Sequence, residues 1–269
     1  MYKKAKEKGT EAISMEYDIP QEEVEVLLPS LIVLNRLLKY TVNDSILLSN
    51  VLLSDAVMFE MLFPKEASFV VKAYEEFTLQ SATSIAERFG RDLDHISRVS
   101  SVALEIYDKM KKLHGYKLRE RTLLQVSAIL QDIGKYVNVK NHALLSYNTI
   151  TNLDIVGIND HERLIIATVC YYHNGNIPSM DSPIYNQLSQ EDRVMVSKLA
   201  AILQISNAIN TSHSPKFEQV NVNMKNGKLN IYLTTLKNIN LEKWAFIAKS
   251  KLFREVYGLN ATIIKRGVL

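Results

Sequence analysis

The chain has 269 residues, enough for one or two domains with hydrophobic cores of their own. Hydrophobic residues make up 47% of it, which excludes global disorder, and a formal net charge of +3 is too small for the footprint of a DNA-binding protein. The single cysteine, Cys170, cannot form an internal disulfide and indicates a reducing compartment. No apolar run approaches the about 20 residues that cross a membrane, so we expect a cytoplasmic protein without a membrane partner.

The first segment of the chain predicts a loose start followed by a helix. Residues 1–17 are polar and show no helical or strand period. Asp18 and Pro20, followed by glutamates, have the chemistry of a helix start. We expect Pro29 to interrupt or restart that helix.

Two further elements are predicted before the main helical region. Ile46–Ser49 is typical of a short buried strand, and Ala56–Phe63 of a short helix that ends at a proline. Residues 1–65 therefore form an α/β fragment, and a lone strand requires a sheet that this fragment does not supply.

The middle of the chain, residues 66–215, predicts a helical bundle. Apolar residues recur there at intervals of three and four, which places them on one face of a helix. The clearest run is Val99, Val102, Ala103, Ile106, Met110 and Leu113. We expect six or seven helices and no strand, so a site would lie between facing helices.

The tail, residues 216–269, changes to a period of two. An Asn226-Gly227 turn between alternating apolar residues predicts a hairpin in which 224 pairs with 229, 222 with 231 and 220 with 233. A helix over 241–257 follows, closed by Gly258, and Ala261–Ile264 is expected to be a third strand. The side chains expected to face inward are Leu241, Trp244, Ala245, Ala248, Leu252 and Val256. The overall prediction is a mainly α fold with a small β-β-α-β cap.

Four residues near the ends of separate elements are candidate ligands of a divalent metal: His95, Asp132, His142 and His173. A bundle brings such ends together, and imidazole and carboxylate groups are common metal ligands. Asp132 is the most specific of them, because it stands among apolar residues and a buried carboxylate requires a partner. The alternative is that each histidine serves helix carbonyls or is solvated.

The other histidines carry no expected role. They are His114, His161 and His213, and their surroundings indicate surface or loop positions.

Two runs, Arg88–Val99 and Ile129–Lys135, resemble the start of an HD-type phosphohydrolase helical domain. The motifs that follow are Asn141–Tyr147, Asn152–Gly157, Ile166–His173 and Ile202–Asn210. As an ordered set, over roughly residues 20–265, they resemble the carboxy-terminal region of the exopolyphosphatase/guanosine pentaphosphate phosphatase (Ppx/GppA) family. The resemblance implies an HD-like bundle, residues 1–65 as the end of an actin-like domain, and a possible homodimer.

The chain departs from the HD pattern at two ligand positions. Gln131 stands where such enzymes have the histidine of their His-Asp doublet, and Asn207 where they have a last aspartate. Neutral amide oxygens bind divalent ions less tightly than imidazole or carboxylate. The resemblance therefore implies Mg²⁺ or Mn²⁺ bound weakly, if at all, unless His142 and His173 compensate.

The resemblance also implies a ligand, polyphosphate or guanosine pentaphosphate. Five cations flank the candidate site and are expected to rim one mouth: Arg88, Arg91, Arg98, Lys135 and Lys140. In the family, hydrolysis belongs to actin-like domains with glycine-rich phosphate loops, which this sequence lacks, so no catalytic residue is assigned. Two hypotheses stay open: a phosphohydrolase, through a remodelled site or an actin-like partner half, and a non-catalytic module for binding or dimerisation.

Overall fold

The computed structural model describes residues 2–41, 57–58, 61–62, 68–214, 216–225 and 227–267. The chain divides into two compact units, Met1–Pro64 and Lys65–Leu269. Within the described part, no helix is both long and apolar enough to span a membrane.

The first unit contains a pair of packed helices, α1 (Tyr2–Tyr17) and α2 (Gln21–Tyr40). Ile13 and Val24 are buried against each other. The prediction of a loose segment over 1–17 is therefore wrong: Ala, Lys and Glu favour a helix, and Ile13 gives it something to bury. A kink at Gly9, with φ +81°, hid the period.

Two details of the first unit also differ from expectation. Asp18 does not cap α2; it has φ +54°, and Pro20 is the capping residue. Pro29 lies inside α2 and does not end it. The predicted strand at 46–49 lies outside the described residues, as does half of the helix at 56–63, so the actin-like character of residues 1–65 stays a prediction.

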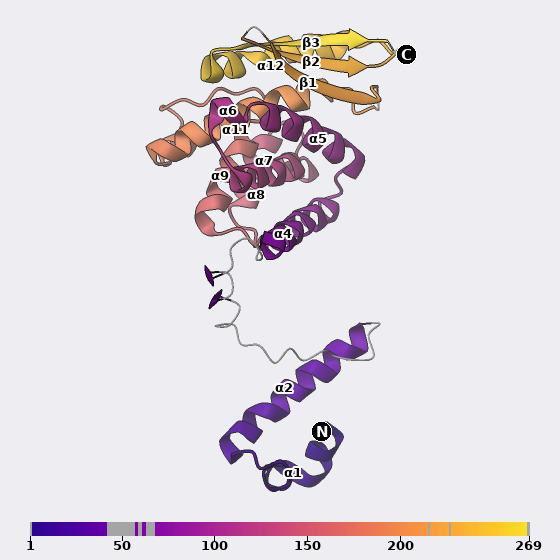
Figure 1. Cartoon of the computed structure of the whole chain (residues 1–269), viewed down its shortest axis with the longest axis vertical. Helices are drawn as coiled ribbons and strands as arrows, with labels where there is room; N and C mark the ends of the chain where they lie inside the picture. Colours follow the sequence, from indigo (N-terminus) through magenta and orange to yellow (C-terminus); the bar gives the residue numbers. More distant parts are fainter. Residues whose placement is uncertain are drawn as a thin grey trace. The chain divides into compact units, whose positions relative to one another are not determined.

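The second unit begins with a helical bundle, as predicted (Figure 1). Its six longer helices are α4 (Ser68–Arg88), α5 (Leu93–Lys109), α7 (Leu118–Leu130), α8 (His142–Ile150), α9 (Asp160–Tyr172) and α11 (Gln190–Ile209). Shorter turns are α6 (Lys111–His114), the 3₁₀ helix η1 (Ile133–Tyr136) and α10 (Pro183–Asn186).

Side-chain caps fix where several of these helices start. The Asp92 carboxylate accepts hydrogen bonds from the backbone N–H groups of Asp94 and His95 at the start of α5. Asn159 and Glu162 form a capping box at the start of α9. These local signals place His95 in the first turn of α5, and so at one end of the bundle.

Helix α7 is the centre of the bundle. It packs against α4, α5, α9 and α11, and eight of its 13 residues are buried. Its last turn leads directly into Gln131, Asp132 and the first two residues of η1, Ile133 and Gly134, which are buried as well. The carboxylate of Asp132 is therefore presented inside the molecule by the most enclosed helix.

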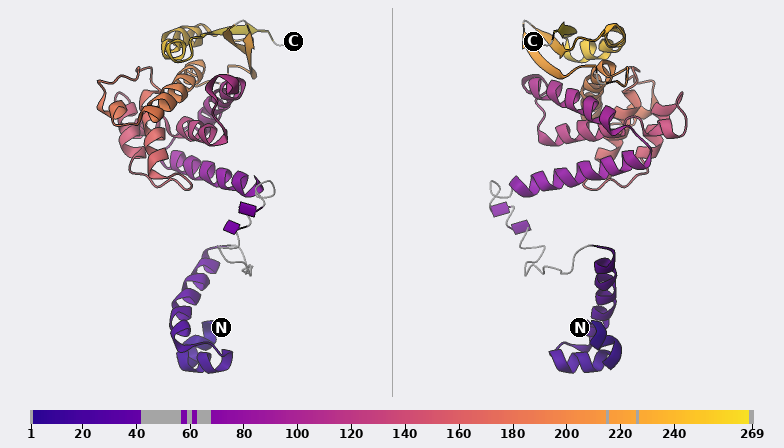
Figure 2. Two further views of the ribbon diagram at one scale, coloured as in Figure 1. Left: turned by 60° about the vertical axis from the view of Figure 1, so that its left-hand side comes forward. Right: turned by 90° about the vertical axis from the view of Figure 1, so that its right-hand side faces the viewer.

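The cap consists of β1 (Gln219–Lys225), β2 (Lys228–Thr234), α12 (Asn240–Tyr257) and β3 (Asn260–Arg266). The predicted hairpin register is confirmed: 224 pairs with 229, 222 with 231 and 220 with 233. Strand β3 pairs in parallel with β2, so the sheet order is β1-β2-β3. Both views of Figure 2 show α12 and the strands as a layer beside α11, against which α12 packs.

The predicted inward face of α12 is partly wrong. Trp244 is 72% and Leu241 48% exposed, and Ala248 is exposed too. The buried residues of α12 are Glu242, Ala245, Phe246, Leu252 and Phe253. The prediction followed hydrophobicity alone and chose the helix face with the largest apolar side chains. In the structure, α12 packs against α11 and the sheet with the adjacent face.

Candidate metal and anion site

Three of the four candidate ligands converge. Asp132, at the end of α7, lies with His142 at the start of α8 and His173 at the end of α9, and each offers one ligand atom within 4.8 Å of the others. All three residues are buried. Nε2 of His173 is 3.2 Å and Nε2 of His142 3.6 Å from Oδ1 of Asp132. We call these three residues the acceptor cluster.

The hydrogen bonds made by Nδ1 of His142 and Nδ1 of His173 determine how the two Nε2 atoms can act in the cluster. Nδ1 of His142 lies 2.8 Å from the carbonyl of Val139, and Nδ1 of His173 contacts the carbonyl of Cys170. A carbonyl oxygen only accepts, so both Nδ1 atoms carry a hydrogen. In the neutral form of each ring, Nε2 then presents a lone pair to the cluster. Histidine metal ligands are oriented by backbone carbonyls in the same way.

The cluster is therefore a set of acceptors that fits a cation. Oδ1 of Asp132 is buried without a hydrogen-bond partner among the described residues, although two imidazole nitrogens face it. Acceptors that face each other require a proton or a metal ion between them. The donor set, one carboxylate and two imidazoles, suits divalent ions of the first transition series.

The other oxygen of Asp132 faces positive charge. Nζ of Lys135 is 2.7 Å from Oδ2. Burial opposes ionisation of this carboxyl, but a hydrogen bond from His173 in its protonated form and the positive charge of Lys135 outweigh it and hold the pKa of Asp132 below its usual range. Burial lowers the pKa of His142, which keeps that ring neutral at pH 7.

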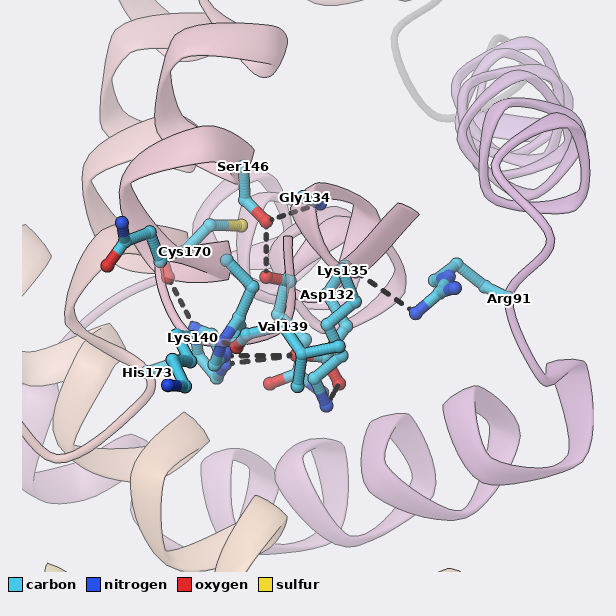
Figure 3. A network of polar contacts seen from close by, with 12 residues as sticks. Arg91, Asp132, Gly134, Lys135, Val139, Lys140, Ser146, Cys170 and His173 are labelled. Carbon is cyan, nitrogen blue, oxygen red and sulfur yellow. Dashed lines mark hydrogen bonds and ion pairs between the residues drawn. The ribbon is translucent and has the colours of Figure 1, made fainter. Parts of the chain in front are cut away.

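A small cavity of about 220 Å³ opens beside this carboxylate, between the turn before α5 and η1. Arg91 and Lys135 line it, and Nη1 of Arg91 donates to the backbone carbonyl of Asp132 at 3.3 Å. Figure 3 shows Arg91 reaching toward Asp132 from the neighbouring turn. We call Arg91 and Lys135 the cationic rim.

His95 forms a wall of this cavity and is not part of the acceptor cluster. Both of its ring nitrogens are buried without a hydrogen-bond partner among the described residues. Its ring stacks on that of His213, with centroids 4.0 Å apart. Burial, together with the nearby His213, lowers the pKa of His95 to about 4, so the ring is neutral at pH 7, with one N–H donor and one acceptor nitrogen.

The remaining predicted residues lie in different places. Gln131 lines the cavity, and both polar atoms of its side chain lack a partner among the described residues. Arg98 lies outside the cavity and donates to the carbonyl of His213. Arg88 and Lys140 are exposed, and within the described part of the chain neither lines the cavity. Of the five cations expected around the site, only Arg91 and Lys135 line this cavity.

A tight crossing holds η1 against α8, and with it Asp132 against His142. Ser146 donates to the carbonyl of Gln131 at 2.9 Å and accepts from the N–H of Gly134 at 2.9 Å (Figure 3). A Cβ on Gly134 would lie 2.3 Å from the carbonyl oxygen of His142. Glycine is required at this position because the backbone of α8 approaches too closely for a Cβ. In the sequence, this requirement is visible only as the glycine of Asp-Ile-Gly.

Sequence reasoning missed two contributors and misplaced one histidine. His213 lies on an exposed loop, as predicted, but its ring also stacks on that of His95, a contact that the sequence did not indicate. Lys249, on α12, lies in the electrostatic neighbourhood of Asp132 and Lys135. His114 was also assigned to the surface but is buried, with Nε2 2.9 Å from the carbonyl of Tyr107. Asn207 is half-buried on α11 and outside the acceptor cluster.

A helical bundle that holds a buried carboxylate and two histidines at the ends of three helices defines the class: a mainly α domain with a small β cap and a buried Asp-His-His cluster. A family model described as Ppx/GppA phosphatase, domain III, matches residues 79–252 of this chain. The match covers α5 to α11 and most of the cap, and more than half of the 269 residues. The chain belongs to the Ppx/GppA phosphatase family.

Proposed function

We propose that this chain binds a divalent cation at the acceptor cluster and the terminal phosphate of polyphosphate or guanosine pentaphosphate in the adjoining cavity. The observation that carries the proposal is that the two carboxylate oxygens of Asp132 face groups of different charge and hydrogen-bonding type. Two imidazole nitrogens face one oxygen, and an ammonium group faces the other. A cation satisfies the first region, and an anion satisfies the second.

Each side chain has a distinct part in such binding. Asp132, His142 and His173 would hold the ion, which when bound supplies positive charge next to a phosphate oxygen. Arg91 and Lys135 offer charge-assisted hydrogen bonds to the remaining oxygens. The cavity, about 220 Å³, accommodates the end of a phosphate chain and leaves the rest of the ligand outside.

Binding is tested by calorimetry with inorganic tripolyphosphate and Mg²⁺ on the full chain. We expect R91M to weaken binding about tenfold or more, because a charged hydrogen bond contributes about 1.5–3 kcal/mol. The matched control is R254M, an exposed arginine on α12. Equal losses in both variants would mean diffuse charge attraction and would contradict the proposal.

Hydrolysis is the second candidate, favoured by one observation: His95 is an unprotonated, unpaired imidazole in the cavity wall, as a general base would be. The family's phosphate loops have no counterpart in the sequence, so we expect the isolated chain to show no turnover. Phosphate release from long-chain polyphosphate, measured against a heat-inactivated control, distinguishes the two. Steady release that is lost in H95Q would establish the hydrolase.

The resemblance also suggests where and with what the chain works. We propose a cytoplasmic location, consistent with its single buried thiol, Cys170. An actin-like partner half or a second copy of the chain are the proposed protein partners. Size-exclusion chromatography with light scattering, of the chain alone and with a co-expressed actin-like half, tests both.

A further inference from the structure

One lysine stands in the buried stripe of the cap helix. The buried residues of α12 lie on one face of the helix: Glu242, Ala245, Phe246, Leu252 and Phe253. Lys249 lies in the same stripe, seven residues after Glu242 and three before Leu252, which are helical intervals of one face. Its side chain is half-buried. An ammonium at such a position loses hydration and requires compensation.

The stem of this side chain packs on the turn that follows His173. A Cβ on Gly175 would lie 3.8 Å from Cγ of Lys249. Gly175 is two residues beyond His173, which belongs to the acceptor cluster. Burial lowers the pKa of Lys249, while Asp132 raises it and Lys135 lowers it further. The cap therefore places a cation beside the turn that follows His173, on a different element from those that carry the cationic rim.

The cap helix itself is firmly seated, so the position of Lys249 is set by the fold. Glu242 is fully buried, and its Oε1 lies 2.8 Å from Nζ of Lys216. Phe246 and Phe253, on either side of Lys249 along the stripe, are buried as well. Lys216 thus has an anionic partner, whereas no hydrogen bond or ion pair joins the ammonium of Lys249 to a described residue.

We propose that Lys249 is an anion-binding residue of this site, which makes the carboxy-terminal cap part of the binding machinery. Lys249 does not line the cavity itself. Its ammonium contacts the part of the phosphate ligand that lies outside the cavity, beside the turn that follows His173. This inference rests on the proposed function and deepens it, because it adds a third cation where the sequence assigned only the region around α5 and η1. The bound anion would be the ion-pair partner that the Lys249 ammonium lacks among the described residues.

The test is the variant K249M, which keeps the length and apolar stem of the side chain and removes its charge. The matched control is K251M on the same helix, whose side chain is 59% exposed. Calorimetry with inorganic tripolyphosphate, with and without Mg²⁺, measures affinity, and thermal unfolding without ligand measures stability. We expect K249M to bind at least about tenfold more weakly, K249R to recover part of the loss, and K251M to behave as the unmodified chain.

Stability separates the binding role from a structural one. Because K249M removes a partly buried charge without a partner, we expect its melting temperature to stay equal or rise. A lower melting temperature with unchanged affinity would mean that Lys249 merely neutralises Asp132, and would overturn the inference. Should R91M weaken binding while K249M does not, the inference fails and the proposed function stands. If the unmodified chain does not bind, the proposed function itself fails.

Discussion

The two oxygens of Asp132 face regions with opposite requirements. In the acceptor cluster, Oδ1 meets two imidazole nitrogens and has no donor among the described residues. At the cationic rim, Oδ2 meets an ammonium at 2.7 Å, next to an arginine. The first region lacks positive charge, and the second holds charge that an incoming anion can use. On the proposed function, we therefore expect a cation and an anion to bind together more tightly than either binds alone.

The largest expected effect comes from removing the carboxylate that the two regions share. In D132N the side-chain amide can donate to an imidazole nitrogen, so the fold is retained while the anionic ligand is lost. We expect Mn²⁺ affinity to fall at least about 100-fold, or about 2.7 kcal/mol, and tripolyphosphate binding to lose its dependence on metal. Electron paramagnetic resonance of free Mn²⁺ measures this.

The matched control for that variant is D154N, at an exposed acid outside the cluster. Retention of Mn²⁺ affinity in D132N, or equal loss in D154N, would show that Asp132 is not a ligand.

Changing one histidine breaks the acceptor cluster and leaves the cationic rim intact. We expect H173Q and H142Q each to weaken Mn²⁺ binding about 10–100-fold, since a neutral amide is a poorer ligand than imidazole. Anion binding without metal should change little, which separates the two regions. H161Q is the control, because His161 is exposed and paired with Asp192. Metal affinity that is insensitive to both cluster histidines would place the ion elsewhere.

The pH dependence of the free energy of unfolding tests whether His95, in the cavity wall, is neutral in the folded chain. His95 has its pKa lowered to about 4 in the folded chain, against 6.5 normally, and faces His213, Asp132, Lys135 and Arg98. Between these values the unfolded state binds the proton first, so stability is complete above pH 6.5 and falls as the pH drops toward 4. We expect a loss of about 2 kcal/mol after solvent screening.

Denaturant unfolding between pH 4 and 7 checks this, with H95Q expected to flatten the profile. His142, whose pKa is also lowered, contributes in the same direction and leaves a residual slope. A profile in H95Q as steep as that of the unmodified chain would contradict the burial of a neutral ring.

The smallest expected effect comes from restoring the two altered ligand positions. Gln131 lies in the cavity wall with unpaired polar atoms, and Asn207 lies on α11. The double variant Q131H/N207D adds an imidazole and a carboxylate, and we expect Mn²⁺ affinity to rise about tenfold, or about 1.4 kcal/mol. Unchanged affinity in titrations matched for pH would mean that these positions do not reach the ion.

The features of the fold and the site that could be predicted from the sequence are those that depend on residues close together in the chain. The hairpin register followed from one Asn-Gly turn and an alternating pattern, and every predicted pair is present. Asp132 was identified because a charge interrupts an apolar run at the end of a helix. Its convergence with His142 and His173 required three helix ends to meet, which no local pattern encodes.

The misses have a different cause. On α12, the large apolar Trp244 drew the prediction to a face that is exposed, and so hid Lys249 in the buried stripe. A glutamate and a lysine seven residues apart on one helix face were the available signal. His213 carries no such signal, because a loop residue reaches His95 only through the tertiary fold.

The most direct test of the central claim is whether cation and anion bind together. Mn²⁺ is titrated into the full chain at pH 7, with and without inorganic phosphate at a concentration that leaves free Mn²⁺ measurable. Lys135 pairs with Asp132, so Mn²⁺ alone should bind no tighter than about 10⁻⁴–10⁻³ M, and phosphate should tighten it about tenfold or more. Micromolar affinity without phosphate, or an affinity that phosphate does not change, would contradict the account.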